Sequence, residues 1–494
     1  MNQTHDAHLF RAQDLQLNSE IELPLIVDLD GTLLLTDTLH ESAALFLKRR
    51  PFFSIFLMAW WLLQGKSVLK DKLAKNTNIR PELLPYNIPF LDWLNLEHKK
   101  GRKLILCTAA NHQIASRVSS YIGIFDDVIS SSATQNLIGS KKIIAIKKQY
   151  SELGFVYAGN SSDDLTVWKH ASESILVNAS EQVKKSLNSI VANFIEFPRQ
   201  KINGMSLLRL LRLHQWSKNL LIFLPILAAH QLHHFESLAL LLGGFISFGL
   251  CASSTYILND IFDLESDRLH PRKKLRPFAS GEIPIHFSSL ILLMFPLSVY
   301  LANLVGEGFL LTILLYTLIT LLYSFGLKSI VILDCIILAA LYTIRIVAGA
   351  VIISNNISFW LLAFSVSLFF SLAFLKRYAE ILNIQTIDRT SVHGRGYVKS
   401  DQGLILPLGI SSGMGSVVVM MLYLNSPEIL ALYSYTPLVW GTIPVLLFWI
   451  SHMWFQAHRG NMHDDPVFFA ITDKVSIITA LIFFVFIFLA AYEF

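Results

Sequence analysis

The chain beyond Met205 contains a series of apolar runs too long and too numerous for a water-soluble fold to bury. A helix of about 20 apolar residues crosses the ~30 Å hydrocarbon core of a bilayer. The composition agrees, because 53% of the residues are hydrophobic and only 15% are charged. We therefore predict an all-α, multi-pass membrane domain over residues 205–494. Its transmembrane helices number about nine by length, at roughly 211–229, 236–258, 287–305, 308–326, 330–353, 358–375, 403–424, 437–456 and 475–492.

Lys and Arg are distributed unevenly among the connections between these helices. With a cytoplasmic start, Lys and Arg are absent from the outer connections, which are 228–236, 303–308, 354–358, 425–436 and 491–494. They gather in the inner connections, which are 259–277, 327–329, 376–402 and 457–474. Cytoplasmic loops are enriched in these residues, and the polar N-terminus lacks the apolar core of a signal peptide. We expect an integral protein of the bacterial inner membrane with its N-terminal part in the cytoplasm.

The inner connection "NDIFDLESDRLHPRKKLRP", residues 259–277, combines regularly spaced acids with a basic run. If the preceding helix continues, Asp260, Asp263 and Asp267 lie on one face, with Asn259 beside them. Carboxylates at this spacing suit Mg²⁺ shared with a diphosphate. Cations for the phosphate oxygens follow directly, as Arg268, Arg272, Lys273, Lys274 and Arg276. A plain solvated loop is the alternative.

The motif N-D-x-x-D-x-x-x-D resembles the first aspartate-rich motif of the UbiA superfamily of membrane prenyltransferases, and "RPFASG" resembles its tail. The segments "LHQWSKNLLIFLP" (213–225), "FLKRYAE" (374–380) and "MHDDPVFFAITDKVS" (462–476) are most similar to the branch typified by decaprenyl-phosphate phosphoribosyltransferase. This resemblance implies a Mg²⁺-dependent transfer of 5-phosphoribose from phosphoribosyl diphosphate to a polyprenyl phosphate. Catalysis and metal binding would then depend on Asp260, Asp263 and Asp267.

The sequence departs from the members that prenylate aromatic acceptors. Their second motif is usually D-x-x-x-D, whereas this chain has "LKRYAEILN", with Lys376 and Arg377. Cations there fit a pocket that also holds a sugar phosphate, although cationic anchors at a helix end would look the same. Lys218 and Arg345 are candidates to hold the lipid phosphate, because an arginine inside a membrane helix costs at least ~2.5 kcal/mol unless it faces a partner. The predicted substrate-binding residues of this domain are Lys218, Asn259, Arg268, Lys273, Arg276, Arg345, Lys376 and Arg377.

The N-terminal part, residues 20–200, alternates short apolar strands with polar segments. Asp28 and Asp30 follow the strand 25–27, Thr108 ends "KLILCT", and Asn160 follows "FVYAG". Polar residues after several strands of a βαβ pattern line the crevice of an open parallel sheet. We predict a doubly wound α/β domain, so that the whole chain is a multi-domain protein.

This pattern resembles the haloacid-dehalogenase (HAD) phosphatase superfamily, with all four motif segments in order. The resemblance implies that Asp28 attacks phosphorus, that Asp30 acts as acid and base, and that Thr108 and Lys142 hold the phosphoryl oxygens. Mg²⁺ would be bound by Asp28, Asp30, Asn160, Asp163 and Asp164. The family commonly has Gly-Asp where this chain has Gly159-Asn160, so a catalytically inactive domain is the alternative.

Between the first two motifs lies "PFFSIFLMAWWLLQGKSVLK", residues 51–70, where such phosphatases carry a helical cap. Its apolar portion of about 13 residues is too short to span a bilayer. Buried cap packing is one interpretation. The other is an interfacial helix with Trp60 and Trp61 at headgroup depth and Lys66 and Lys70 towards anionic lipid.

Together the two domains suggest a two-step enzyme. The transferase would leave a 5-phosphate on its lipid-linked ribose, and the phosphatase, joined by the short linker at about 197–207, would remove it. Two alternatives remain: polyprenyl transfer from an allylic diphosphate to an aromatic acceptor, and a soluble domain that only regulates or scaffolds. The expected partners are a polyprenyl phosphate or diphosphate, phosphoribosyl diphosphate and membrane lipids, with no nucleic acid.

Overall fold

The computed structural model describes residues 23–491 except for 52, 133–134, 151–153, 200, 232, 355–357, 386–394, 427–432, 434 and 463–464. These residues form two units. The first extends to Ile202 and also contains Phe278–His286; the second contains Asn203–Pro277 and the chain from Phe287 onward. The short segment Phe278–His286, which the sequence placed in the membrane domain, therefore groups with the N-terminal unit.

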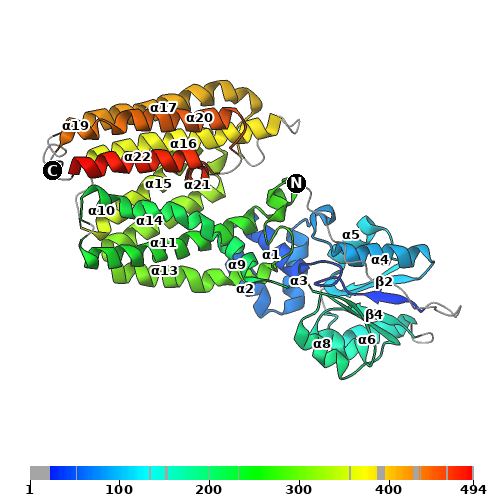
Figure 1. The fold of residues 1–494 in the computed structure, drawn as a ribbon. Coiled ribbons are helices and arrows are strands. Elements are labelled where there is room, and N and C mark those ends of the chain that lie inside the picture. Colours follow the sequence, from blue (N-terminus) through cyan, green and yellow to red (C-terminus); the bar gives the residue numbers. More distant parts are fainter. Residues whose placement is uncertain are drawn as a thin grey trace. The chain divides into compact units, whose positions relative to one another are not determined.

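The first unit is built on a six-stranded sheet in which every pair of neighbouring strands is parallel (Figure 1). Its strand order is β3-β2-β1-β4-β5-β6. The chain therefore winds outward in one direction from β1 to β3 and in the other from β4 to β6, and ligand sites form at such a switch point. The prediction of an α/β unit with a parallel sheet is confirmed. The strands are β1 Leu25–Val27, β2 Leu104–Asn111, β3 Asp127–Ser131, β4 Val156–Gly159, β5 Glu173–Val177 and β6 Ile195–Phe197.

Both faces of this sheet are buried, because alternate residues of each strand enter different cores. In β1, Leu25 and Val27 enter one core and Ile26 enters the other. The helices between β1 and β2 include a small core of their own, centred on Phe46, Leu69 and Leu73. The helical elements of the unit are α1 Thr38–Arg49, α2 Ser54–Leu63, α3 Lys66–Asn76, η1 Pro81–Leu83, α4 Ile88–Lys99, α5 His112–Ile122, α6 Ser140–Tyr150, η2 Ser162–Asp164, α7 Leu165–Trp168 and α8 Glu181–Asn188.

The second unit is helical, and eight of its spans within the described residues are long and apolar enough to cross a membrane. Several of these helices lie side by side in Figure 1. The prediction of an integral membrane domain is confirmed. The long helices are α11 Phe235–Phe262, α13 Ile291–Val305, α14 Glu307–Phe325, α15 Leu333–Ile352, α16 Phe359–Gln385, α17 Gln402–Leu424, α20 Thr442–His458 and α22 Lys474–Ala491.

The ninth expected span, at 211–229, does not form one continuous helix. It folds as the 3-10 helix η3, Leu213–Phe223, followed by the short helix α10, Leu224–Ala228. The polar residues of "HQWSKN" interrupt the apolar run, and Pro225 lacks the N–H that would continue the hydrogen bonding of a preceding helix. The expectation of about nine spans is therefore corrected to eight within the described part of the chain.

Helix α15 contributes to both large cores of the second unit. Its Ile346 belongs to the core shared with α16, α17 and α20, and its Ala348 to the core shared with α11 and η3. At Gly349 a Cβ atom would lie 1.9 Å from the carbonyl oxygen of Ile222, so η3 approaches the α15 backbone closely. This close approach brings the polar residues of η3 next to α15.

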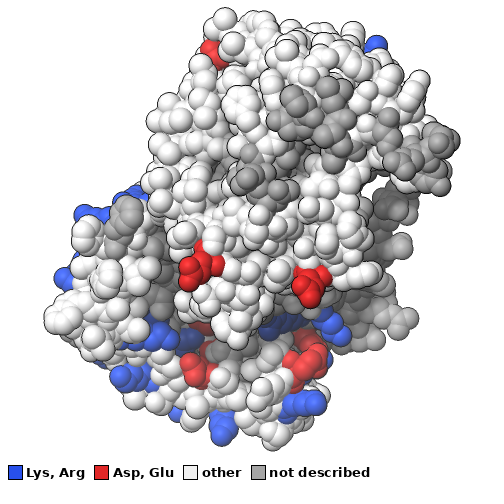
Figure 2. Space-filling view, turned by 90° about the vertical axis from the view of Figure 1, so that its left-hand side faces the viewer, with Lys and Arg blue, Asp and Glu red and all other residues white. Residues whose placement is uncertain are grey.

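The surface of the second unit is strongly apolar, as lipid contact requires. Large side chains such as Leu292, Leu293 and Phe488 are exposed. Figure 2 shows a view of the molecule in which uncharged residues dominate the upper part, interrupted by few charged side chains, while most Lys, Arg, Asp and Glu side chains gather towards the lower end. The remaining short elements are α9 Gly204–Leu211, α12 Leu264–Leu269, η4 Lys273–Leu275, η5 Ile285–Leu290, η6 Leu327–Ser329, η7 Lys399–Asp401, α19 Thr436–Val439 and α21 Pro466–Thr472.

Candidate functional site

In the first unit, the carboxyl ends of three neighbouring strands carry predicted site residues. Val27 pairs with Leu106 on β2 and with Ala158 on β4. Asp28 follows Val27, Thr108 lies two residues after Leu106, and Asn160 lies two residues after Ala158. All three therefore sit at the same edge of the sheet, at the switch point.

Lys142, from α6, joins this group. Its ammonium donates to Asp28 Oδ1 at 2.9 Å, to the Tyr157 hydroxyl at 2.9 Å and to Asp164 Oδ1 at 3.3 Å. Burial alone would lower the pKa of Lys142, but the carboxylates of Asp164 and Asp28 raise it above its ordinary value. A permanent positive charge therefore lies beside Asp28, as the binding of a phosphoryl group requires.

Asp28 and Asp30 hold protons with different affinities. Burial raises the pKa of Asp28 to about 6, while the Lys142 charge acts to lower it. Burial, followed by the charge of Asp37, raises the pKa of Asp30 to about 8. Asp30 also accepts hydrogen bonds from the Thr38 backbone nitrogen at 2.8 Å and from its hydroxyl at 3.2 Å. An ionised carboxylate next to a protonated one is the pairing that a nucleophile and a general acid need.

The segment that follows β4, residues 160–164, supplies one amide that fits a metal ion and one carboxylate that is already engaged. Asp164 Oδ1 accepts from Tyr157 and Lys142, and its Oδ2 accepts from Asn160 and Ser161. Asp163 is exposed. A Cβ atom on Gly31 would lie 2.1 Å from the Asn160 amide nitrogen, so the Asn160 side chain lies against the turn that carries Asp30.

A Mg²⁺ ion at this edge would have few protein ligands. Within the described residues, no group of three or more His, Cys, Asp or Glu side chains is placed to hold a metal ion. The side chains that fit best are therefore the Asp28 carboxylate and the Asn160 amide oxygen, which are hard donors of the kind that Mg²⁺ prefers. Mg²⁺ keeps several water ligands in such sites.

Lys70 lies inside the N-terminal unit and not on its surface. It lies on the buried face of α3 with Leu69 and Leu73, and its ammonium donates to the Ala109 carbonyl at 2.6 Å. The charge of Asp30 acts on Lys70, although burial lowers its pKa overall. The suggestion that Lys70 faces anionic lipid is therefore wrong, because its side chain enters the unit next to the end of β2. The sequence does indicate this burial, because Lys70 lies next to Leu69 and three residues before Leu73, on the apolar side of the helix.

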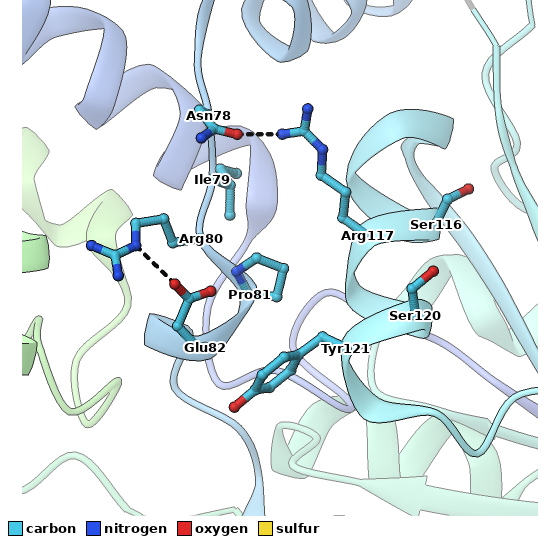
Figure 3. A pocket seen from close by; sticks show the side chains of 9 residues that line it. All are labelled: Asn78, Ile79, Arg80, Pro81, Glu82, Ser116, Arg117, Ser120 and Tyr121. Atoms are coloured by element: carbon cyan, nitrogen blue, oxygen red, sulfur yellow. Dashed lines mark hydrogen bonds and ion pairs between the residues drawn. The ribbon is translucent and has the colours of Figure 1, made fainter.

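A cavity of about 580 Å³ in the same unit is lined by none of the predicted residues. It lies between η1 and α5 (Figure 3). Its two arginines are engaged, since Arg117 donates to Asn78 at 2.6 Å and Arg80 to Glu82 at 2.9 Å. The lining residues are Asn78, Ile79, Arg80, Pro81, Glu82, Ser116, Arg117, Ser120 and Tyr121.

In the second unit, two of the three predicted aspartates converge. Asp260 lies in the last turn of α11 and Asp267 in α12, and both are buried. The same nitrogen of Arg276, Nη1, lies 3.2 Å from Asp260 Oδ1 and 2.6 Å from Asp267 Oδ2. Arg212 also binds Asp260. Asp263, which caps α11, instead accepts from Lys328 at 2.8 and 3.1 Å.

The Asp260 and Asp267 carboxylates therefore already face a shared positive group. Burial raises the pKa of Asp267 to about 6, against the lowering effect of Arg276. Two buried carboxylates around one cation fit Mg²⁺, which would relieve their repulsion as Arg276 does here. The helix break at Asp263 turns the third carboxylate towards Lys328, so the expected single stripe of three is divided. Asn259 precedes Asp260 in α11, Arg268 lies in α12 and Lys273 begins η4.

Arg345 is buried without a carboxylate partner in the described part of the chain. Its Nε donates to Asn219 Oδ1 at 2.9 Å, its Nη2 to the Tyr316 hydroxyl at 3.3 Å, and its Nη1 to the Leu341 carbonyl. The amide nitrogen of Asn219 is itself buried with no hydrogen-bond partner. The guanidinium also lies over the rings of Phe248, Tyr316 and Tyr342, at 5.0–5.9 Å from their centroids. A buried cation held by neutral groups, beside an unsatisfied amide donor, favours the binding of an anion there.

Two lysines meet at Asp465, a carboxylate in the segment 462–476 that was not among the predicted site residues. Asp465 accepts from Lys218 at 2.6 Å, from Lys376 at 3.0 Å and from the Tyr342 hydroxyl at 3.1 Å. Burial would raise the pKa of Asp465, but Lys376 and Lys218 lower it strongly. Asp465 thus holds two predicted substrate-binding lysines from η3 and α16 together.

Arg377 has a different environment from its neighbour Lys376. Its Nε lies 2.5 Å from Asp334 Oδ2 and its Nη1 lies 2.7 Å from Glu380 Oε2. The Tyr397 hydroxyl donates to the other oxygen of Asp334 at 2.6 Å. Because two carboxylates already balance its charge, Arg377 is the weaker of the two candidates for binding a substrate phosphate.

We expect Asp334→Asn to destabilise the protein, because it leaves a buried guanidinium with one carboxylate fewer. The cost should be about 3 kcal/mol in the free energy of unfolding, seen as a lower melting temperature of the detergent-solubilised protein. Lys399→Gln, at an exposed lysine, should melt like the parent. A normal melting temperature combined with weakened substrate binding would instead assign Arg377 to the substrate.

Comparison with known proteins covers both units. An uncharacterized protein of Sinorhizobium fredii, y4nM, is 36% identical over 458 residues, which are 92% of this chain and 88% of that protein. The decaprenyl-phosphate phosphoribosyltransferase of Mycolicibacterium smegmatis is 34% identical over 211 residues, 41% of this chain and 64% of that enzyme. A solved structure of a UbiA homologue from Archaeoglobus fulgidus bound to GPP and Mg²⁺ gives a TM-score of 0.43 at 18% identity, covering 57% of this chain and 99% of that one.

The family assignment comes from the helical unit. Residues 220–472 match the description "UbiA prenyltransferase family". The matched range contains Asp260 and Asp267 with their shared arginine, the buried Arg345 and the Lys376–Asp465 pair. The chain belongs to the UbiA prenyltransferase family.

Proposed function

We propose that the helical unit transfers 5-phosphoribose from phosphoribosyl diphosphate to a polyprenyl phosphate. The observation that carries this proposal is the buried Arg345, whose partners in the described residues are neutral, beside the unsatisfied amide nitrogen of Asn219. A guanidinium beside a free amide donor suits the several oxygens of a phosphate. The named similarity to decaprenyl-phosphate phosphoribosyltransferase adds support.

The residue types suit the chemistry of this transfer. An oxygen of the lipid phosphate forms a bond to the anomeric carbon, and the bond from that carbon to the diphosphate oxygen breaks, so diphosphate leaves with the electron pair. Because the attacking phosphate is already anionic, no general base is required. Positive charge beside the leaving group stabilises the transition state. Arg276, which lies 2.6 Å from Asp267 Oδ2, and the neighbouring Lys273 would supply it.

Mg²⁺ bound to Asp260 and Asp267 would supply further positive charge for the diphosphate. Asp263 would then act through its ion pair with Lys328, which fixes the turn between α11 and α12. The sugar 5-phosphate would be held by Lys376 and the lipid phosphate by Lys218 and Arg345.

For the N-terminal unit we propose phosphate-monoester hydrolysis, supported by the Asp28, Asp30 and Lys142 geometry. An Asp28 oxygen would attack phosphorus while Asp30 donates a proton to the leaving oxygen, and water would then hydrolyse the acyl phosphate. The substrate would be the 5-phosphate of the lipid-linked ribose. A short linker keeps that product at an effective concentration on the order of millimolar.

The test of the transferase proposal is a comparison of donors with one enzyme preparation. Membranes containing the chain receive ribose-labelled phosphoribosyl diphosphate with polyprenyl phosphate, or a labelled allylic diphosphate with an aromatic acid. The proposal predicts label in the lipid extract from the first pair and background from the second. The reverse pattern would favour polyprenyl transfer to an aromatic acceptor.

Lys376→Gln should raise the KM for phosphoribosyl diphosphate about 10-fold or more, since a lost charged contact to a phosphate costs about 1.5–3 kcal/mol. The kcat should change less, because the contact is to a group that does not react. Steady-state kinetics on the solubilised protein measure both. Lys474→Gln, at an exposed lysine, is the matched control, and an equal effect of the two variants would contradict the assignment of Lys376.

A further inference from the structure

Helix α2 presents an apolar surface that nothing in its own unit covers. The helix reads SIFLMAWWLL and contains no charged residue. Its inner face packs through Leu57, Met58 and Trp61 against the small core of α1 and α3. The large apolar side chains on and next to the other face are exposed, at Phe53 72%, Ile55 62%, Phe56 76%, Trp60 61%, Leu62 54% and Leu63 84%.

This pattern differs from that of a surface helix in water. A helix that packs on a protein core through one stripe normally carries polar residues on the opposite side. In α2 both sides are apolar. Packing within the cap explains the partly buried Trp61, but it does not explain why the exposed side carries Trp60. A contiguous exposed apolar patch of this kind marks a contact with a protein or a membrane.

The charges around α2 favour a membrane that contains anionic lipid. The sequence has no Asp or Glu from Ser42 to Lys70. Lys48, Arg49 and Arg50 precede the helix, Lys66 follows it, and all four are exposed. Basic residues next to an apolar interfacial helix are attracted to anionic headgroups.

A short linker joins the unit that contains α2 to the membrane-spanning unit. The last strand of the unit ends at Phe197, and α9 of the membrane-spanning unit begins at Gly204. We propose that the exposed face of α2 inserts into the headgroup region of the bilayer that the second unit spans. This anchor would hold the N-terminal unit against the membrane whether or not that unit is a phosphatase.

Site-specific labelling of the full chain tests the proposal. The native Cys107, Cys251 and Cys335 are buried, so a cysteine introduced at Phe56 reacts selectively with an NBD fluorophore. Ile144→Cys is the matched control, because Ile144 is 68% exposed on α6 of the same unit. Both variants are reconstituted in nanodiscs of phosphatidylcholine and phosphatidylglycerol, and Leu63→Cys provides a second position on α2.

For an inserted helix, NBD at position 56 should emit at shorter wavelength than at position 144 and be quenched at least ~3-fold less by aqueous iodide. It should also be quenched by doxyl-labelled lipids. Equal iodide quenching at positions 56 and 144 would overturn the proposal. So would protection from iodide without quenching by doxyl lipids, because protein and not lipid would then cover α2.

Discussion

Asp260→Asn should lower the rate of transfer to the lipid by at least ~10²-fold, the scale of losing a main electrostatic stabiliser of the transition state. Asp260 is 3% exposed and shares Arg276 with Asp267, so the variant removes one of two charges that would hold Mg²⁺ at the diphosphate. Transfer is measured as ribose label in the lipid extract at saturating donor.

Glu265→Gln is the matched control for this variant. Glu265 lies in the same acidic segment, in α12, but has no role in the proposed metal site, so its variant should keep parental activity. Full activity of Asp260→Asn, with protein levels equal to the parent, would contradict the role of the aspartates. A loss in both variants would show that the segment, and not the Asp260 charge, is what activity requires.

Asp28→Asn should abolish release of the 5-phosphate while leaving transfer intact. Removing a nucleophile typically lowers a rate by ~10³-fold or more, and Asp28 is the carboxylate that Lys142 holds at 2.9 Å. The phosphorylated lipid should therefore accumulate in the variant and the dephosphorylated lipid in the parent. Thin-layer separation of the lipid products measures the ratio.

Asp92→Asn, at an exposed aspartate of α4, should give the parental product ratio. An identical product mixture from Asp28→Asn and the parent would mean that the N-terminal unit does not act on this lipid. The transfer step would stand in that case, because it depends on residues of the other unit.

The sequence predicted the elements whose signal is local. Strands 25–27, 104–111 and 156–159 are short apolar runs before polar residues, and eight apolar spans are long enough to be recognised by length alone. The prediction of a continuous helix at 211–229 was wrong, because the mean hydropathy of the whole run hides the polar residues of η3. Lys218 and Asn219 are buried there against α15, a tertiary contact that a window of the sequence does not contain.

Pairing between distant residues was the part that could not be predicted. Asp334 lies on the same helix as Arg345, yet it binds Arg377 of α16. Asp465 holds Lys218, although 247 residues separate them. Both contacts depend on helix packing, and the identities of the residues indicate only that each buried charge needs some partner.

The most direct test of the two-step account uses phosphoribosyl diphosphate labelled with ¹⁴C in the ribose and ³²P in the 5-phosphate. The parent chain, purified into nanodiscs with polyprenyl phosphate and Mg²⁺, receives this donor, and lipid and aqueous products are separated over time. The account predicts ¹⁴C in the lipid, a falling ratio of ³²P to ¹⁴C in that lipid, and ³²P appearing as inorganic phosphate. Absence of ¹⁴C from the lipid, or a ³²P to ¹⁴C ratio that stays equal to that of the donor, would contradict it.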